Sequence, residues 1–456
     1  MPKPELGTSP RAIWSLTWPQ LLMMYIVFFM GLTSVWVGGQ ISANVQAALG
    51  MVTQCSLFLM VVIMALSSGA TAAISQSLGA FRVRRAERYV ATTVLGSLGL
   101  GLIMALVGWG YGDGILRLIM VPEAIRPLAA ELWQVFMLTL PAQYVYSATG
   151  VIFRATRLVL PPLWVAALVC AANLAGCLGF GLGWFGLPDC GYMGLAWSNF
   201  GAQCLGAACN ALLLVRSGYL RRRAIPSLRW LRMGLPYLVR VALPAAAAQI
   251  VWQSGYLTLF VLVASLPVDS VHALAGLTAG LRAEALLFLP GMAFNMTVAV
   301  LVGNSLGEGR PAQAKRVALA LVGLAAAAMS VVAIIIWPFR ADIAAQLSQE
   351  AATRVQIVSY LSYNLVSTPF SIASTVMGGI MVGAGATQYN LMVYGGTFWL
   401  VRLPLGWLLG HRLWGTASGV FAAMVVSQCL QTLIMLYVVL RRDWARFAMN
   451  RQRRPR

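Results

Sequence analysis

Two stretches of this sequence, SQSLGAFRVRRAERYV at 75–90 and VGNSLGEGRPAQAKRV at 302–317, contain matching residues that lie 228 positions apart, half of the 456-residue chain. In this register Ser77-Leu78-Gly79 matches Ser305-Leu306-Gly307, and six of the twelve residues in 77–88 are identical. Each stretch joins two apolar segments through a basic loop. The repeat therefore predicts that the two halves of the chain share one architecture.

The composition excludes a water-soluble, disordered or fibrous protein. Hydrophobic residues make up 60% of the chain and charged residues only 10%, and the mean hydropathy is +0.79. A soluble domain has about 45–50% apolar and about 25% charged residues. The length is therefore better counted in membrane crossings of about 20 residues each.

Twelve apolar segments predict transmembrane helices, and no alternation typical of a β-barrel occurs. We expect an all-α polytopic membrane protein with two six-helix lobes, residues 1–225 and 226–456. Because six is even, both lobes enter the membrane in the same direction, which predicts a pseudo-two-fold axis along the membrane normal. The predicted helices are 14–38, 45–77, 89–112, 128–153, 161–186, 193–215, 241–266, 273–303, 317–338, 354–384, 390–410 and 416–440.

The basic residues predict the orientation. With the N-terminus in the cytoplasm, 25 of the 32 Lys and Arg residues fall on the inner side and five on the outer side, while Arg282 and Arg402 fall inside helices. This bias predicts that both termini are cytoplasmic. The net charge of +20 is then a topology signal, and we expect the lipid bilayer rather than nucleic acid as the partner. Seven cysteines without regular spacing predict neither a disulfide framework nor a zinc site.

Several motifs resemble those of the MATE family, the multidrug and toxic compound extrusion transporters. The two repeated loops are similar to the family's "vGqalGagrpeear" loops, and MVGAGATQYN (381–390) is similar to its "lrGaGdtr" loop. FRATRLVLPP (153–162) looks like a shortened version of that loop. The stretches 280–309 and 399–406 resemble the family's eighth and eleventh helices, and Pro19 and Pro244 also agree with it.

The resemblance implies two six-helix lobes around a central V-shaped cavity and export of organic, often cationic, compounds in exchange for H⁺ or Na⁺. No other cofactor is implied. We expect the bacterial inner (plasma) membrane as the location, from the family and from the lack of a targeting segment. We also expect a monomer. No Walker A or HExxH motif occurs in the chain, so the sequence predicts a secondary transporter rather than an ATP-driven one, and no enzyme.

Glu284 is the predicted cation-coupling residue. It is the one acid of twelve that falls well inside a predicted helix, where an ionisable side chain is costly, and it matches the acid of the family's "R-x-E" pattern. The alternative is a structural ion pair, for which Arg402 is a better candidate than Arg282, two residues away on the same helix. In the N-terminal lobe, Thr33 and Cys177 stand where many or some family members carry Asp, so coupling from that lobe cannot be transferred to this chain.

Polar and aromatic residues on three predicted helices define a candidate substrate pocket in the C-terminal lobe. Their side chains suit an amphipathic cation, or alternatively they make hydrogen bonds between helices. The substrate-binding candidates are Gln249, Gln253, Tyr256, Phe288, Asn295, Tyr360, Tyr363 and Asn364.

Two further functions compete with antiport. A flippase for a lipid-linked or other amphipathic lipid would need a strongly cationic cavity, and only Arg282 and Arg402 lie within the helices. A non-transporting membrane scaffold or sensor is the other alternative, which the missing N-terminal acids favour.

Overall fold

The computed structural model describes residues 10–118, 122, 123 and 125–449, in which every regular element is helical. The chain ends, predicted to be cytoplasmic, lie outside these residues. Two compact units are present: the N-terminal unit, residues 9–242, and the C-terminal unit, described over 243–449. The division falls inside a helix, α8, whereas we placed the lobe boundary at residues 225 and 226.

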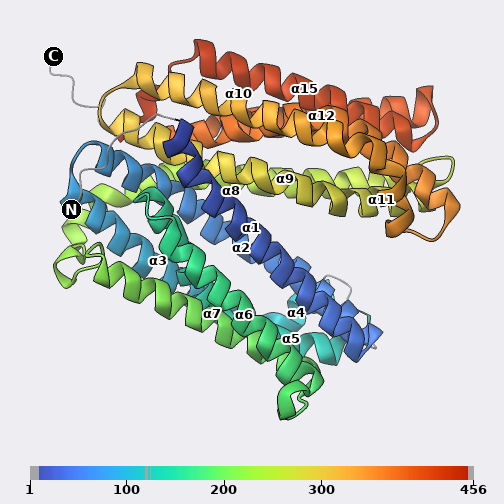
Figure 1. Cartoon of the computed structure of the whole chain (residues 1–456), viewed down its shortest axis with the longest axis horizontal. Helices are drawn as coiled ribbons and strands as arrows, with labels where there is room; N and C mark the ends of the chain where they lie inside the picture. The colour runs from blue at the N-terminus through green and yellow to red at the C-terminus, as the bar shows by residue number, and fades with distance from the viewer. Residues whose placement is uncertain (1–9, 119–121, 124, 450–456) are drawn as a thin grey trace. The chain divides into compact units, whose positions relative to one another are not determined.

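In the N-terminal unit, long helices coincide with the first six predicted segments (Figure 1). Helix α5 is central, because it packs against α2, α3 and α7, while α6 packs against α1 and α7. The elements are α1 (Pro10–Ile41), α2 (Ala43–Gly79), α3 (Val83–Gly110), α4 (Gly112–Leu118), α5 (Arg126–Ala155), α6 (Leu160–Leu182), η1 (Trp184–Gly186), α7 (Gly191–Arg216), η2 (Arg222–Ala224) and the first part of α8 (Leu228–Ala264).

In the C-terminal unit, helix α12 takes the central place, packed against α9, α10 and α15 (Figure 1). The elements are the remainder of α8, α9 (Ser270–Gly307), α10 (Pro311–Ile336), η3 (Trp337–Phe339), α11 (Arg340–Leu347), α12 (Ala351–Ala384), α13 (Gln388–Thr397), η4 (Phe398–Arg402), α14 (Leu403–Trp407), η5 (Leu408–Leu413), α15 (Ala417–Arg441) and η6 (Trp444–Phe447).

The eleventh predicted segment is helical but not a uniform α-helix. Eleven helices of the described chain are long and apolar enough to cross a membrane. The remaining segment, 388–413, alternates between α-helix in α13 and α14 and π-helix in η4 and η5. Pro404 is the second residue of α14, two positions after the end of η4, and a proline leaves the carbonyl four residues earlier without its helical N–H partner. A π-helical turn is the kind of irregularity that often occurs at functional sites.

The sequence repeat corresponds to a repeated turn. After α2, the N–H groups of Phe81 and Arg82 donate to the carbonyls of Leu78 (2.9 Å) and Ser77 (2.9 Å). After α9, Gly309 and Arg310 donate in the same way to Leu306 (3.0 Å) and Ser305 (3.0 Å). This is the hydrogen-bond pattern of a Schellman helix end, which needs a left-handed residue. Phe81 (φ 54°) and Gly309 (φ 77°) supply it in the two halves.

A second pair of turns follows the same offset of 228 residues. Arg157 (φ 63°) and Gly385 (φ 75°) are left-handed. The next residue in each half donates back to the carbonyl of Phe153 (2.9 Å) or Met381 (2.7 Å). The two halves therefore end corresponding helices by the same backbone geometry, although most of their side chains differ.

Close packing of α9 on α12 determines the core of the C-terminal unit. Gly379 and Gly383 are one helical turn apart on α12, and a Cβ atom at either position would overlap a backbone carbonyl of α9, at Asn295 or Ala299. Small residues spaced by four allow helix backbones to approach closely in a membrane. The amide of Asn295 joins the same interface by donating to the carbonyl of Thr375 (2.6 Å).

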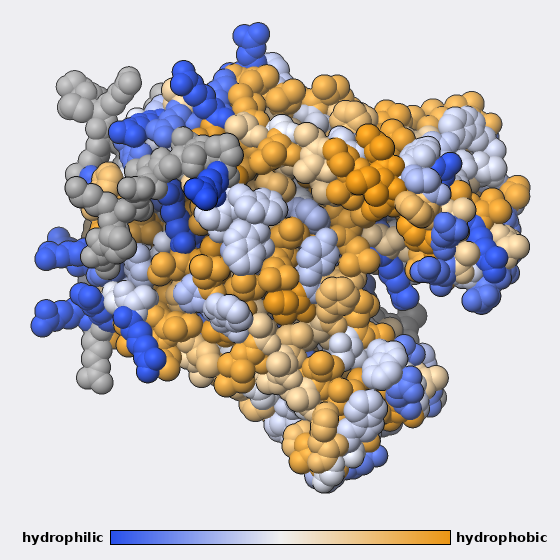
Figure 2. Space-filling model, viewed as in Figure 1, coloured by the Kyte–Doolittle hydropathy of each residue, from blue (hydrophilic) through white to orange (hydrophobic). Residues whose placement is uncertain are grey.

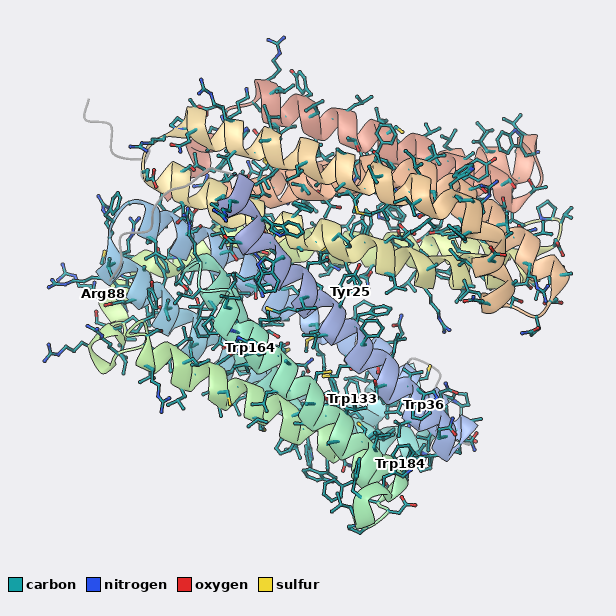
Figure 3. The ribbon with its side chains drawn as sticks, viewed as in Figure 1. Tyr25, Trp36, Arg88, Trp133, Trp164 and Trp184 are labelled. Carbon is teal, nitrogen blue, oxygen red and sulfur yellow. The ribbon has the colours of Figure 1, made fainter. Side chains whose placement is uncertain are left out.

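Hydrophobic and hydrophilic residues are distributed on the visible surface as expected for a membrane protein. Hydrophobic residues cover the long sides of the helices, and hydrophilic residues gather toward their ends (Figure 2). Within the N-terminal unit, Arg88 lies at the opposite end from Trp36 and Trp184 (Figure 3).

A surface cluster joins the starts of α9 and α12. The ring nitrogens of His272 lie 2.6 Å from an oxygen of Asp269 and 2.8 Å from one of Glu350. Thr353 also donates to Glu350, at 2.8 Å. The hydrogen bonds from Thr353 and His272 lower the pKa of the Glu350 carboxyl below its ordinary value.

We predict that replacing Gly379 by Leu destabilises the protein by about 1–3 kcal/mol or prevents folding, because the backbone of α9 cannot move aside in a packed core. Gly323→Leu is the matched control, since nothing lies within 4 Å of a Cβ atom at this exposed glycine of α10. Thermal unfolding and gel filtration in detergent measure the effect. Equal stability of the two variants would contradict the close approach of α9 and α12.

We also predict that the Glu350 cluster weakens in acid. A carboxyl whose pKa is lowered by folding contributes stability above its unfolded pKa, about 4.3, and loses that contribution as the pH falls through the folded pKa. At pH 7, Glu350→Gln should speed hydrogen exchange in the first turns of α9 and α12, and the wild type should approach this rate below about pH 4. Asp342→Asn, at an exposed acid of α11, is the control; the same response from it would refute the assignment.

Candidate functional site

Glu284 lies in the middle of α9, partly buried in the C-terminal unit. The hydroxyl of Tyr360, on α12, donates a hydrogen bond to its carboxylate, and the side chain of Asn364, one turn further along α12, is a second partner. Tyr360 is 1% exposed. Its ring lies against Gly280 of α9, where a Cβ atom would overlap it. The glycine therefore provides the space that lets the tyrosine reach the carboxylate.

Arg402, the last residue of the π-helical segment η4, is a buried cation. Its side chain is 3% exposed. The Nε atom donates to Ser427 Oγ at 2.8 Å, and one terminal nitrogen donates to Gln428 Oε1 at 2.7 Å. Both partners are neutral and lie on α15. Buried guanidinium groups are normally paired with a carboxylate, so this arrangement is unusual.

The predicted ion pair between Glu284 and Arg402 is not a direct contact. Within the described residues, no carboxylate oxygen lies within 4.0 Å of an Arg402 nitrogen, and Arg282 makes no salt bridge either. The hydrogen bonds to Ser427 and Gln428 hold the guanidinium against α15, while Tyr360 holds the carboxylate against α12. The charges of Glu284 and Arg402 still influence each other, so Arg402 acts across a gap rather than through a salt bridge.

Aromatic rings pack around the guanidinium of Arg402. The guanidinium carbon of Arg402 lies 4.5 Å from the ring centre of Phe398 and 5.6 Å from that of Trp252. Tyr256 packs against both rings, at 5.3 and 5.4 Å between centroids. Tyr256 is also an electrostatic neighbour of both Glu284 and Arg402. The site thus combines one acid, one base, two phenols and two apolar rings.

The structure brings some of the candidate residues together and separates others. Glu284, Tyr360, Asn364, Tyr256 and Arg402 form one cluster. Asn295 is instead a helix-to-helix hydrogen-bond donor. Arg282 is exposed on α9. The remaining candidates are partly buried and make no side-chain hydrogen bond within the described residues: Gln249, Gln253, Phe288 and Tyr363.

The polar stripe on α15 was missed by the sequence analysis. Ser427 and Gln428 hold Arg402, and one turn away Gln431 donates to Ser374 of α12 at 2.8 Å and accepts from Thr397 of α13 at 3.1 Å. The signal was present as Ser-Gln-Cys-Leu-Gln-Thr (427–432) in an otherwise apolar segment. Without the tertiary structure, nothing linked these residues to Arg402.

Among the described residues of the N-terminal unit, no equivalent cluster surrounds the two positions where the sequence lacks an acid. The hydroxyl of Thr33 donates to its own helix, at the carbonyl of Phe29 (2.9 Å). Cys177 is buried and donates to Asn173 (3.7 Å). The acid that does meet a tyrosine in this unit is Glu131, which accepts a hydrogen bond from Tyr192 at 2.6 Å at an exposed position.

The described part of the chain contains no candidate metal site. No group of three or more His, Cys, Asp and Glu residues is placed to hold a metal ion among these residues. The seven cysteines, all of which are described, are free.

A family model described as MatE matches residues 19–178 and 244–408, more than half of the chain. Protein DETOXIFICATION 39 of Arabidopsis thaliana is 23% identical over 448 residues, which cover 95% of this chain and 84% of that protein. A Bacillus subtilis protein named Probable multidrug resistance protein YpnP is 24% identical over 416 residues, covering 90% of this chain and 91% of the relative.

The fold is similar to that of solved transporters. A crystal structure of a variant of the Vibrio cholerae MATE transporter VcmN has a TM-score of 0.87 at 18% identity, covering 94% of this chain and 95% of that chain. At this identity the likeness shows the fold alone. It confirms the predicted class, an all-helical membrane protein with twelve helices in two lobes.

We predict that Tyr360→Phe destabilises the protein by about 1–3 kcal/mol, because it leaves the partly buried carboxylate of Glu284 without its hydroxyl donor. Tyr363→Phe, one turn away on α12, is the matched control, since this tyrosine makes no hydrogen bond within the described residues. Thermal unfolding in detergent at neutral pH compares the two. If both variants unfold at the same temperature, the Tyr360–Glu284 hydrogen bond contributes nothing to stability.

Proposed function

This chain belongs to the MATE family of multidrug and toxic compound efflux transporters, and we propose that it exports organic, amphipathic and often cationic compounds in exchange for H⁺ or Na⁺. A transporter family implies a multi-pass membrane protein that handles small organic substrates and is not an enzyme. The coupling ion and the substrate class are the parts that we propose.

The observation that supports coupling is the environment of Glu284. Within the C-terminal unit this acid combines a position in the middle of a membrane-crossing helix with a hydrogen bond from a buried tyrosine and a nearby buried arginine. An ionisable side chain inside a membrane segment costs free energy, so its presence there indicates a functional site. A carboxylate that changes its charge is what an ion-coupled exchanger needs.

The proposed cycle uses this carboxylate twice. From the outside, Glu284 takes up a proton or Na⁺, which neutralises its charge and favours release of the exported compound. After the ion is released to the inside, the carboxylate is free to attract the next substrate. The two lobes would alternate between inward- and outward-facing states. The neighbouring rings of Tyr256 and Trp252 offer faces on which an amphipathic compound can lie.

The distribution of basic residues supports the proposed location. Because 25 of the 32 Lys and Arg residues fall on one side of the predicted topology, we place both termini in the cytoplasm and the protein in the inner (plasma) membrane. We propose that the working unit is a monomer.

The test is efflux from proteoliposomes that contain the purified full chain and a fluorescent organic cation. We expect a proton gradient or a sodium gradient to drive export by the wild type and the Glu284→Gln variant to lose it, because an amide cannot exchange its charge. The control is Glu131→Gln, which changes an exposed acid of the N-terminal unit in the same way and should leave export intact.

Two outcomes would contradict the proposal. Full coupled export by Glu284→Gln would exclude this carboxylate as the coupling group. No export of several cations by wild-type protein that unfolds cooperatively would favour a lipid flippase or a non-transporting protein instead.

A further inference from the structure

We infer that Arg402 makes Glu284 selective for a proton over Na⁺, so that a proton gradient alone drives export. This inference rests on the proposed function and names its coupling ion. It assigns to Arg402 the role of a specificity-determining residue that touches neither the coupling ion nor the carboxylate.

The position of Arg402 is fixed by its surroundings. Two hydrogen bonds to Ser427 and Gln428 use the fork of the guanidinium, and the ring of Phe398 covers its face. With 3% exposure, the group cannot turn toward water. An arginine side chain remains charged at every pH at which proteins fold, so its positive charge is a permanent feature of the C-terminal unit.

The charged and titratable side chains that face Glu284 come from three elements: Tyr360 from α12, Tyr256 from α8 and Arg402 from η4. Among the described residues that influence Glu284, Arg402 supplies the positive charge, because Arg282 is exposed on α9. Like charges in a site of low dielectric constant repel each other strongly. A Na⁺ ion bound to Glu284 would therefore be repelled by the nearby positive charge of Arg402.

The atoms around Glu284 favour a proton for a second reason. Hard cations such as Na⁺ need several oxygen ligands, whereas the hydroxyl of Tyr360 faces the carboxylate as a donor and an arginine has only donors. The side chain of Asn364, the second hydrogen-bond partner, also lowers the cost of the ionised carboxylate and so meets it as a donor. A proton needs no ligand shell. It adds to one carboxylate oxygen, gives a neutral acid, and leaves Arg402 as the single charge of the cluster.

The first experiment uses the full chain in proteoliposomes loaded with a fluorescent organic cation. A pH gradient without Na⁺ and a Na⁺ gradient at equal pH are imposed separately. We expect the wild type and Arg402→Lys to respond to the pH gradient alone. Arg402→Gln should gain at least a tenfold larger response to Na⁺, because the repelling charge is gone.

Arg412→Gln is the matched control. Arg412 lies in η5 of the same broken helix, with its guanidinium 5.4 Å from the ring centre of Trp407, but it is exposed. Its loss should leave the ion preference unchanged. Wild-type export driven by a Na⁺ gradient at equal pH would overturn the inference, and so would an Arg402→Gln variant that exports but ignores Na⁺.

A binding measurement separates this inference from the proposed function. Radioactive ²²Na⁺ is titrated into the detergent-purified wild type, Glu284→Gln and Arg402→Gln. We expect no Glu284-dependent binding by the wild type at Na⁺ concentrations that saturate Arg402→Gln. Wild-type binding that Glu284→Gln abolishes would overturn the inference even if no export is seen, whereas absence of export with either gradient would count against the proposed function alone. If Arg402→Gln does not fold, the wild-type titration still decides.

Discussion

The close approach of α9 and α12 is the constraint on which the rest of the C-terminal unit depends. Gly379 and Gly383 let the two backbones touch, and Gly280 leaves room for the ring of Tyr360. In a membrane there is no hydrophobic force between helices, so such close packing and the hydrogen bonds across it must hold them together. Glu284 can be hydrogen-bonded from α12 because the helices meet at this distance.

The buried guanidinium of Arg402 is the second feature that defines the cluster around Glu284. Removing an arginine from water is costly unless hydrogen bonds and charge compensate for it. Here two neutral side chains of α15 and the faces of aromatic rings provide the hydrogen bonds and the cation–π contacts. The counter-charge is on another helix and is not in direct contact. Because of this separation, the carboxylate of Glu284 is not held in a salt bridge with Arg402.

The two halves of the chain share their backbone turns but not their chemistry. The left-handed residues at 81 and 309, and at 157 and 385, end helices with the same hydrogen bonds. In the N-terminal unit, however, the partners at the two corresponding positions are neutral: Thr33 bonds to the carbonyl of Phe29, and Cys177 bonds to Asn173 and to Ser34 of α1. A duplicated fold can thus place its ionisable site in one half, because helix ends depend on the backbone while a site depends on a few side chains.

The sequence by itself determined the helical class, the twelve segments, the repeat and the position of Glu284 inside a helix, because hydropathy, charge and local turn geometry are properties of neighbouring residues. It could not show that Arg402 binds Ser427 and Gln428 rather than Glu284, or that the eleventh segment contains π-helix at 398–402. It also could not separate Asn295, a helix-to-helix donor, from Asn364, a partner of Glu284. Those outcomes depend on which faces of distant helices meet, and only the packing of the tertiary structure decides that.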